Sequence, residues 1–182
     1  MLDNYNLKNL MEGKKKKLNS RNKGNTFERK ICAIFNEFFE TQEFIRSPGS
    51  GAFSTTHRLP EHLRFSGDLI TPKTFKFTIE CKKGYNKENI GSIFNPRSDI
   101  ISFIDQAEKD SDKISKNFLL IFQQDRKNIL CLFNENNSIG LSALGEKKDH
   151  IFIRILNKSY IICRLEDLLD ATKIESVRSL WM

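Results

Sequence analysis

The spacing of apolar positions along the chain predicts two helices within the first 110 residues. From Asn25 onward, apolar residues recur every three or four positions, which gives a helix one apolar stripe to pack against a core. This stripe consists of Phe27, Ile31, Ile34, Phe35 and Phe38. A second stripe, made of Ile100, Ile101, Phe103, Ile104 and Ala107, predicts a helix from about Ser98 to Asp110.

Shorter apolar runs predict strands between and after these helices. We expect strands at residues 43–47, 67–72, 74–82, 117–124, 128–134, 150–156 and 159–163, followed by a closing helix at residues 164–173. The first strand after the second helix is continuously apolar, which is typical of a strand covered on both faces. Residues 46–67 and 84–98 are rich in turn-forming residues and predict loops. This order of elements predicts an α/β fold with a mixed central β-sheet flanked by helices.

The strand predicted at residues 74–82 has one apolar and one polar face. Successive side chains of a strand point to opposite faces. One face therefore carries Phe75, Phe77, Ile79 and Cys81, and the other carries Lys76, Thr78, Glu80 and Lys82. The polar face is either exposed to solvent or part of a site that holds metal and phosphate.

Length and charge indicate one globular domain with a polyanionic partner. The chain has 182 residues, of which 38% are apolar and 29% are charged. Its formal net charge of +7 and its pI of about 9.2 favour nucleic acid as a partner ahead of an anionic membrane. Residues 1–23 lack an apolar period and contain the run Lys14–Lys17, so we expect a flexible basic arm there and a single domain at residues 24–182.

The sequence disfavours zinc ribbons and membrane proteins. The four cysteines, Cys32, Cys81, Cys131 and Cys163, are widely spaced among apolar residues, which indicates buried thiols. The polar N-terminus does not have the apolar segment of a signal peptide, and the longest apolar run, residues 118–122, is far too short to span a bilayer. We therefore expect a cytoplasmic protein, in a prokaryotic cell or a phage-infected host, without a membrane partner.

Three acidic residues and one lysine are the candidates for catalytic chemistry, and each also has an ordinary structural interpretation. Asp68 stands at the start of a predicted strand and could be a turn residue that bonds the local backbone. Glu80 and Lys82 could simply face solvent. Glu28 stands three residues after Asn25, where it could complete a capping box at a helix start.

The placement of these residues on neighbouring strands favours a metal site. Neighbouring strands lie roughly 5 Å apart, so Asp68 and Glu80 could converge on one cation. Mg²⁺ usually takes one or two carboxylates together with waters and substrate phosphate, and Mn²⁺ could substitute for it. Lys82 shares a face with Glu80 and could hold the attacking water or neutralise charge on the phosphate. Glu28 could reach the same site from the first helix, whereas Gln106 on the second helix is expected to face solvent.

These residues resemble the signature of the PD-(D/E)xK nuclease superfamily. Asp68 followed by Glu80-Cys81-Lys82 has the order of that signature, with Gly67 in place of its proline. The segment RNKGNTFERKICAIF is similar to the opening helix of archaeal-type Holliday junction resolvases, and FIRSPGSG resembles their segment that carries a functional serine. Some phage and bacterial recombination nucleases share this architecture. The resemblance spans residues 21–83, and none is evident beyond about residue 115.

The resemblance implies a restriction-endonuclease-like core and a set of site residues. Glu28, Asp68 and Glu80 would be carboxylates associated with Mg²⁺, Lys82 the catalytic lysine, and Ser50 a serine of the site. The alternative for Ser50 is an ordinary residue of a flexible loop. The resemblance also implies a homodimer, because a four-way junction has approximate two-fold symmetry and its resolution needs paired cuts. The apolar C-terminus, Leu180-Trp181-Met182, is a candidate for the interface.

The leading hypothesis is a Mg²⁺-dependent endonuclease that hydrolyses phosphodiester bonds in DNA, specifically a Holliday junction resolvase acting on branched DNA. The basic residues expected to bind the DNA backbone are Arg46, Arg58, Arg64, Lys83 and Lys87. One alternative is a restriction-type or DNA-repair endonuclease that acts on duplex DNA. Another is a basic DNA-binding module without turnover, although clustered carboxylates would repel DNA unless a cation intervened.

Overall fold

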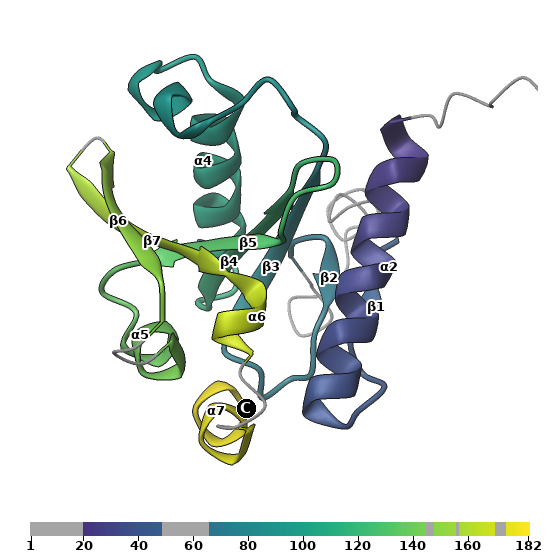
Figure 1. Ribbon diagram of the computed structural model, residues 1–182. Helices are drawn as coiled ribbons and strands as arrows, with labels where there is room; N and C mark the ends of the chain where they lie inside the picture. The colour runs from purple at the N-terminus through teal and green to yellow at the C-terminus, as the bar shows by residue number, and fades with distance from the viewer. Residues whose placement is uncertain (1–19, 49–65, 145–147, 156, 170–173) are drawn as a thin grey trace, which may run out of the picture.

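A computed structural model describes residues 20–48, 66–144, 148–155, 157–169 and 174–182 (Figure 1). The described residues up to Asp112 form helix α2 (Ser20–Phe39), strands β1 (Ile45–Arg46), β2 (Leu69–Ile70) and β3 (Phe77–Lys83), the 3₁₀ helix η2 (Ile90–Phe94) and helix α4 (Asp99–Asp112). The C-terminal half contains strands β4 (Asn117–Gln123) and β5 (Leu130–Asn134), helix α5 (Ser138–Leu144), strands β6 (His150–Ile155) and β7 (Lys158–Arg164), and helices α6 (Leu165–Leu168) and α7 (Ile174–Trp181).

A mixed five-stranded sheet organises the chain, in the order β3-β4-β5-β7-β6. Strands β3 and β4 are parallel, with Phe77 opposite Asn117 and Lys83 opposite Gln123. The remaining neighbours are antiparallel, and β1 and β2 form a separate two-stranded sheet. The observed architecture confirms the predicted α/β fold with a mixed sheet and flanking helices.

The two faces of the sheet pack against different helices (Figure 1). Helices α2, α5, α6 and α7 cover one face, which holds the larger apolar core. Helix α4 covers the other face through Ile101, Ile104 and Ala107. Its start agrees with the prediction, because the Ser98 side chain caps it by accepting a hydrogen bond from the Ile101 amide.

Trp181, next to the last residue of the sequence, lies inside the larger core and not on the surface. It is fully buried, and its ring centroid lies 4.6 Å from that of Phe77. Met182 packs partly buried against the same core. The prediction that Trp181 belongs to a dimer interface is therefore wrong, because the side chain is already used within the fold.

Several element boundaries differ from those predicted. Helix α2 begins at Ser20, five residues before the predicted start, and α5 and η2 lie in segments without a predicted helix. A capping box formed by Asn89 and Ser92 starts η2, so polar residues typical of loops here begin a helical turn. In place of the closing helix predicted at residues 164–173, the chain forms the separate helices α6 and α7, and residues 170–173 lie outside the described part.

The four cysteines are free and buried, as the sequence predicts. Cys131 and Cys163 lie opposite each other on β5 and β7, with 3.5 Å between their sulfur atoms. Among the described helices, none combines the length and the apolar content needed to cross a membrane.

Candidate active site

Asp68 is fixed beside β3 by three hydrogen bonds. Its backbone amide donates to the Ile79 carbonyl at 2.9 Å, and its carbonyl accepts from the Ser47 amide at 2.8 Å. The Cys81 amide donates to Asp68 Oδ2 at 2.9 Å. This partner lies thirteen residues away on β3, so the interpretation of Asp68 as a locally bonded turn residue is wrong. The side chain is 5% exposed and lies next to the Glu80-Cys81-Lys82 segment.

The polar face of β3 is covered by α4 and is not exposed to solvent. Thr78 and Glu80 on this face are each 2% exposed. The Lys82 ammonium donates to Glu80 Oε1 at 2.6 Å and lies 5.1 Å from the centre of the Phe103 ring on α4. Burying an ion pair beneath a helix costs desolvation free energy unless both charges are well hydrogen-bonded. The bonded pair therefore indicates that the fold forms a polar site on this face.

Gln106 is a site residue that the sequence prediction missed. Its side-chain oxygen accepts a hydrogen bond from the Lys82 ammonium at 2.9 Å, although the residue is exposed as predicted. Gln106 follows Phe103 by three residues, so both lie on the same side of α4. That spacing could have indicated the contact only if Phe103 had been known to face Lys82.

Glu28 lies in the interior of α2, where a capping role is excluded. The residue is 6% exposed, and Arg46 on β1 donates to its Oε2 at 2.5 Å. Arg46 also donates to the side-chain oxygen of Asn25 at 2.8 Å. Asn25 is the sixth residue of the helix that begins at Ser20, so the capping-box interpretation is wrong. Arg46, predicted to bind DNA, is held within an ion pair in this structure.

Burial and mutual repulsion raise the pKa values of the two central carboxyl groups. Burial raises the pKa of Asp68 to about 6, with a further contribution from the charge of Glu28 and an opposing one from the Cys81 amide. Burial also raises the pKa of Glu80 to about 7, and the negative charge of Asp68 adds to this effect. For Lys82, burial lowers the pKa, but the charge and hydrogen bond of Glu80 together with the charge of Asp68 raise it, and the pKa is raised overall. The site therefore holds more negative charge than Lys82 alone stabilises.

The donor set of this site suits a hard divalent cation. Asp68 and Glu80 each use one carboxylate oxygen in the hydrogen bonds above, and each has a second oxygen that a cation could bind. Within the described ranges, no group of three or more His, Cys, Asp and Glu side chains is placed to hold a metal ion. Glu28 therefore does not complete a three-carboxylate cluster here. Two carboxylates with waters and phosphate are a usual set of ligands for Mg²⁺.

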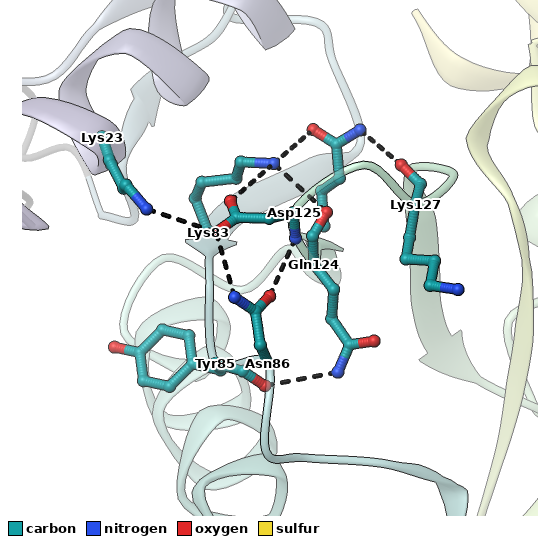
Figure 2. A network of polar contacts seen from close by, with 8 residues as sticks. Lys23, Lys83, Tyr85, Asn86, Gln124, Asp125 and Lys127 are labelled. Atoms are coloured by element: carbon teal, nitrogen blue, oxygen red, sulfur yellow. Dashed lines mark hydrogen bonds and ion pairs between the residues drawn. The ribbon is translucent and has the colours of Figure 1, made fainter. Parts of the chain in front are cut away.

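Lys83 belongs to a polar network that joins α2, β3 and the turn between β4 and β5 (Figure 2). Its ammonium donates to Gln123 Oε1 at 3.1 Å and to the Gln124 carbonyl at 3.2 Å, and it lies 3.6 Å from Asp125 Oδ1. Asp125 also pairs with Lys23 of α2 at 3.2 Å and accepts from Asn86 at 3.0 Å. This network anchors the end of β3 directly after Lys82.

The other predicted site residues are only partly placed. Lys87 is exposed in the segment that follows β3 and is accessible to a ligand. Ser50, Arg58 and Arg64 lie outside the described residues, so their predicted roles in catalysis and DNA binding stay predictions.

A mixed sheet flanked by helices defines a restriction-endonuclease-like core, and Asp68 lies in it beside the Glu-Cys-Lys segment of one strand. The chain belongs to the phage putative PDDEXK endonuclease family, whose model matches residues 19–179. The match includes the C-terminal strands, for which the sequence alone showed no resemblance. No curated protein and no solved structure matches the chain. The PD-(D/E)xK superfamily suggested by the sequence is thereby confirmed.

Proposed function

We propose that this protein is a Mg²⁺-dependent endonuclease that hydrolyses phosphodiester bonds in DNA. The observation that carries the proposal is the meeting of two buried carboxyl groups of raised pKa with a lysine bonded to one of them. Perturbed carboxyl groups beside a lysine are typical of a catalytic site. Membership of an endonuclease family supports the same conclusion.

Asp68 and Glu80 would hold the Mg²⁺ ion, with Mn²⁺ as a substitute. The bound cation would supply electrophilic stabilisation of the phosphate and lower the pKa of a water molecule. The chain itself places the carboxylates, through the Cys81 amide on Asp68 and the Lys82 ammonium on Glu80. Glu28 contributes negative charge to Asp68 from the adjacent helix and is assigned to the same site.

Lys82 is the residue assigned to contact the substrate phosphate or the attacking water. An ammonium group has three donors, and Glu80 and Gln106 accept from Lys82 in this structure. Counting acceptors among the described residues, one donor is therefore left for the substrate. A positive charge in a partly water-excluded site is well suited to stabilise charge that develops on the phosphate.

Branched DNA is the substrate class that we propose for this site. Two segments support it, the residues 21–35 and 44–51 that resemble junction resolvases. Paired cuts in a four-way junction would need two sites, so the proposal includes a homodimer. Exposed Lys87, together with Arg58 and Arg64, would bind the DNA backbone, and Ser50 would assist at the phosphate.

The test compares an end-labelled immobile four-way junction with a linear duplex of matched sequence, each with Mg²⁺ or with EDTA. Wild-type protein is assayed beside Glu80→Ala and Lys82→Ala, and light scattering measures its oligomeric state. Metal-dependent paired nicks near the branch point, absent from both variants, support a junction-resolving nuclease. Equal cutting of both DNAs would instead indicate a general or restriction-type nuclease, and junction binding without any cut would indicate a binding module.

A further inference from the structure

An apolar cavity of about 200 Å³ opens beside the catalytic lysine on the α4 face of the sheet. Lys82 itself forms part of its wall, so the cavity is continuous with the proposed active site. The floor is made by sheet residues such as Phe122, Leu130 and Ile162, and the opposite side by Ile93 of η2 and Phe103 of α4.

Aromatic rings line the end of this cavity nearest to Lys82. Tyr85 and Phe103 meet edge to face, with 4.6 Å between their ring centroids, and both line the cavity. Phe103 also lies beneath the Lys82 ammonium. Flat apolar walls of this kind are suited to a planar ring, because aromatic stacking on a base is worth about 1 to 3 kcal/mol.

One polar residue of the cavity wall, Glu88, has a carboxylate oxygen left unsatisfied by the described residues. Glu88 lines the cavity, and within the described part of the chain its Oε2 atom is buried and has no hydrogen-bond partner. Its backbone is held in place, because the Glu88 carbonyl accepts from Gln124 Nε2 and its amide donates to the Tyr85 carbonyl at 3.0 Å. A buried acceptor without a donor is costly, so a ligand with an N–H group would be favoured there.

We propose that this cavity receives a nucleobase that has been unstacked from the substrate DNA next to the cleaved phosphate. This inference rests on the proposed function and names the part of the substrate that the site reads. A nucleobase combines a flat apolar face with N–H donors on its edge, whereas an apolar protein side chain would leave Glu88 unpaired. The amino groups of cytosine, adenine and guanine suit a carboxylate acceptor. Thymine is disfavoured because its N–H lies between two carbonyl groups that the carboxylate repels.

The test combines variants of the cavity with DNA substrates that lack one base. Ile93→Trp fills the cavity, Phe152→Trp on exposed β6 is its matched control, and circular dichroism checks that each variant is folded. An abasic site is placed in turn at each position around the cut. At one position the missing base slows wild-type cleavage about tenfold, whereas Ile93→Trp cleaves at the same reduced rate with and without that base. Full additivity of the two effects at every position would overturn the proposal.

A second comparison tests Glu88 with a nearly isosteric change. At the same position, thymine is cut about tenfold more slowly than cytosine by wild type. Glu88→Gln removes this difference, because an amide can donate to a thymine carbonyl, while Glu175→Gln, at an exposed position of α7, keeps it. An unchanged preference in Glu88→Gln would overturn the proposal.

Binding measured with Ca²⁺ separates this inference from the proposed nuclease activity. Fluorescence anisotropy with the same DNAs compares wild type and Ile93→Trp without cleavage. If the protein cuts no DNA, but Ile93→Trp and the missing base lower its DNA affinity non-additively, the base site is supported and the proposed nuclease activity fails. If the protein cuts DNA and neither affinity nor rate shows that loss, the activity stands and the base site fails. Absence of DNA binding overturns both.

Discussion

Gln106 on α4 and Lys82 on β3 lie 24 residues apart in the sequence and are joined by a hydrogen bond of 2.9 Å. Glu80 accepts from the same ammonium group at 2.6 Å. The lysine is thus held from the sheet side by Glu80 and from the helix side by Gln106. An extended lysine side chain has many rotamers, so these two acceptors reduce the entropy lost when it meets the substrate.

Removal of the Gln106 acceptor is expected to slow the chemical step and to leave substrate binding nearly unchanged. In Gln106→Ala, kcat should fall about tenfold with little change in KM, because a hydrogen bond to a charged group is worth about 1.5 to 3 kcal/mol. Single-turnover cleavage measures the effect. Gln106→Glu keeps an acceptor for Lys82 and should recover most of the rate, and Gln42→Ala at an exposed position is the control. Equal rates for Gln106→Ala and wild type would contradict the positioning role.

Cation binding and catalysis should be separable within the site. Asp68→Asn and Glu80→Gln should each weaken Mn²⁺ binding by at least about tenfold, since both remove a charged ligand. Lys82→Met should keep or strengthen Mn²⁺ binding, because it removes a competing positive charge, yet it should abolish cleavage. Electron paramagnetic resonance of free Mn²⁺ measures the affinity, with Glu175→Gln as the control. Loss of Mn²⁺ binding in Lys82→Met, or its persistence in Glu80→Gln, would contradict these assignments.

The sequence predicted the parts of the site that depend on local pattern. The alternation along residues 75–82 placed Glu80 and Lys82 on one face, and the position of Asp68 before that strand indicated the pairing seen in the structure. Gln106 and the cover provided by α4 could not be predicted in this way. They depend on how a helix packs across the sheet, and the local spacing of apolar residues does not determine that packing.

The same limit applies to the roles predicted for basic and terminal residues. Arg46 was predicted to bind DNA from its charge, yet the fold places it against Glu28 in an ion pair. Trp181 was predicted to lie at an interface from its apolar character, yet the fold buries it in the core. Charge and hydropathy indicate that a side chain needs a partner, and only the tertiary structure decides which partner it has.

The stability of the metal-free protein should fall as the pH rises from about 5 to 8. Burial raises the pKa of Asp68 to about 6 and that of Glu80 to about 7, so the folded state prefers the neutral acids. The stability contributed by their protonation is complete below the unfolded pKa values near 4 and is lost as the pH passes through the folded values. Urea unfolding in EDTA should show a loss of roughly 2 to 5 kcal/mol over this range.

A divalent cation and a double variant provide the controls for this pH dependence. Mg²⁺ should restore stability at pH 8, because it stabilises the ionised carboxylates of the folded state. Asp68→Asn combined with Glu80→Gln removes both titrating groups, so its stability should change much less between pH 5 and pH 8. An equally steep change in the double variant would show that other groups are responsible.

Gly67 should be intolerant of any side chain, because it combines an unusual backbone angle with a close approach to β3. Its φ angle is +84°, and an added Cβ would lie 2.5 Å from the Ile79 carbonyl oxygen and 2.8 Å from Thr78 Cγ2. The proline of the superfamily signature, whose φ is fixed near −65°, does not fit this conformation either. In Gly67→Ala, the strained φ and the collision should lower the free energy of unfolding by about 3 kcal/mol and Tm by about 10 °C.

Gly84→Ala separates the two causes of that loss. Gly84 also has a positive φ, +99°, but no atom lies within 4 Å of a Cβ built there. Its alanine variant should therefore carry only the cost of the strained backbone, about 1 kcal/mol. Only Gly67→Ala should also weaken Mn²⁺ binding, because the collision with Ile79 displaces the backbone that holds Asp68 beside β3. Calorimetry and Mn²⁺ titration measure both effects, and an equal loss of stability in the two variants would contradict the role of the close approach.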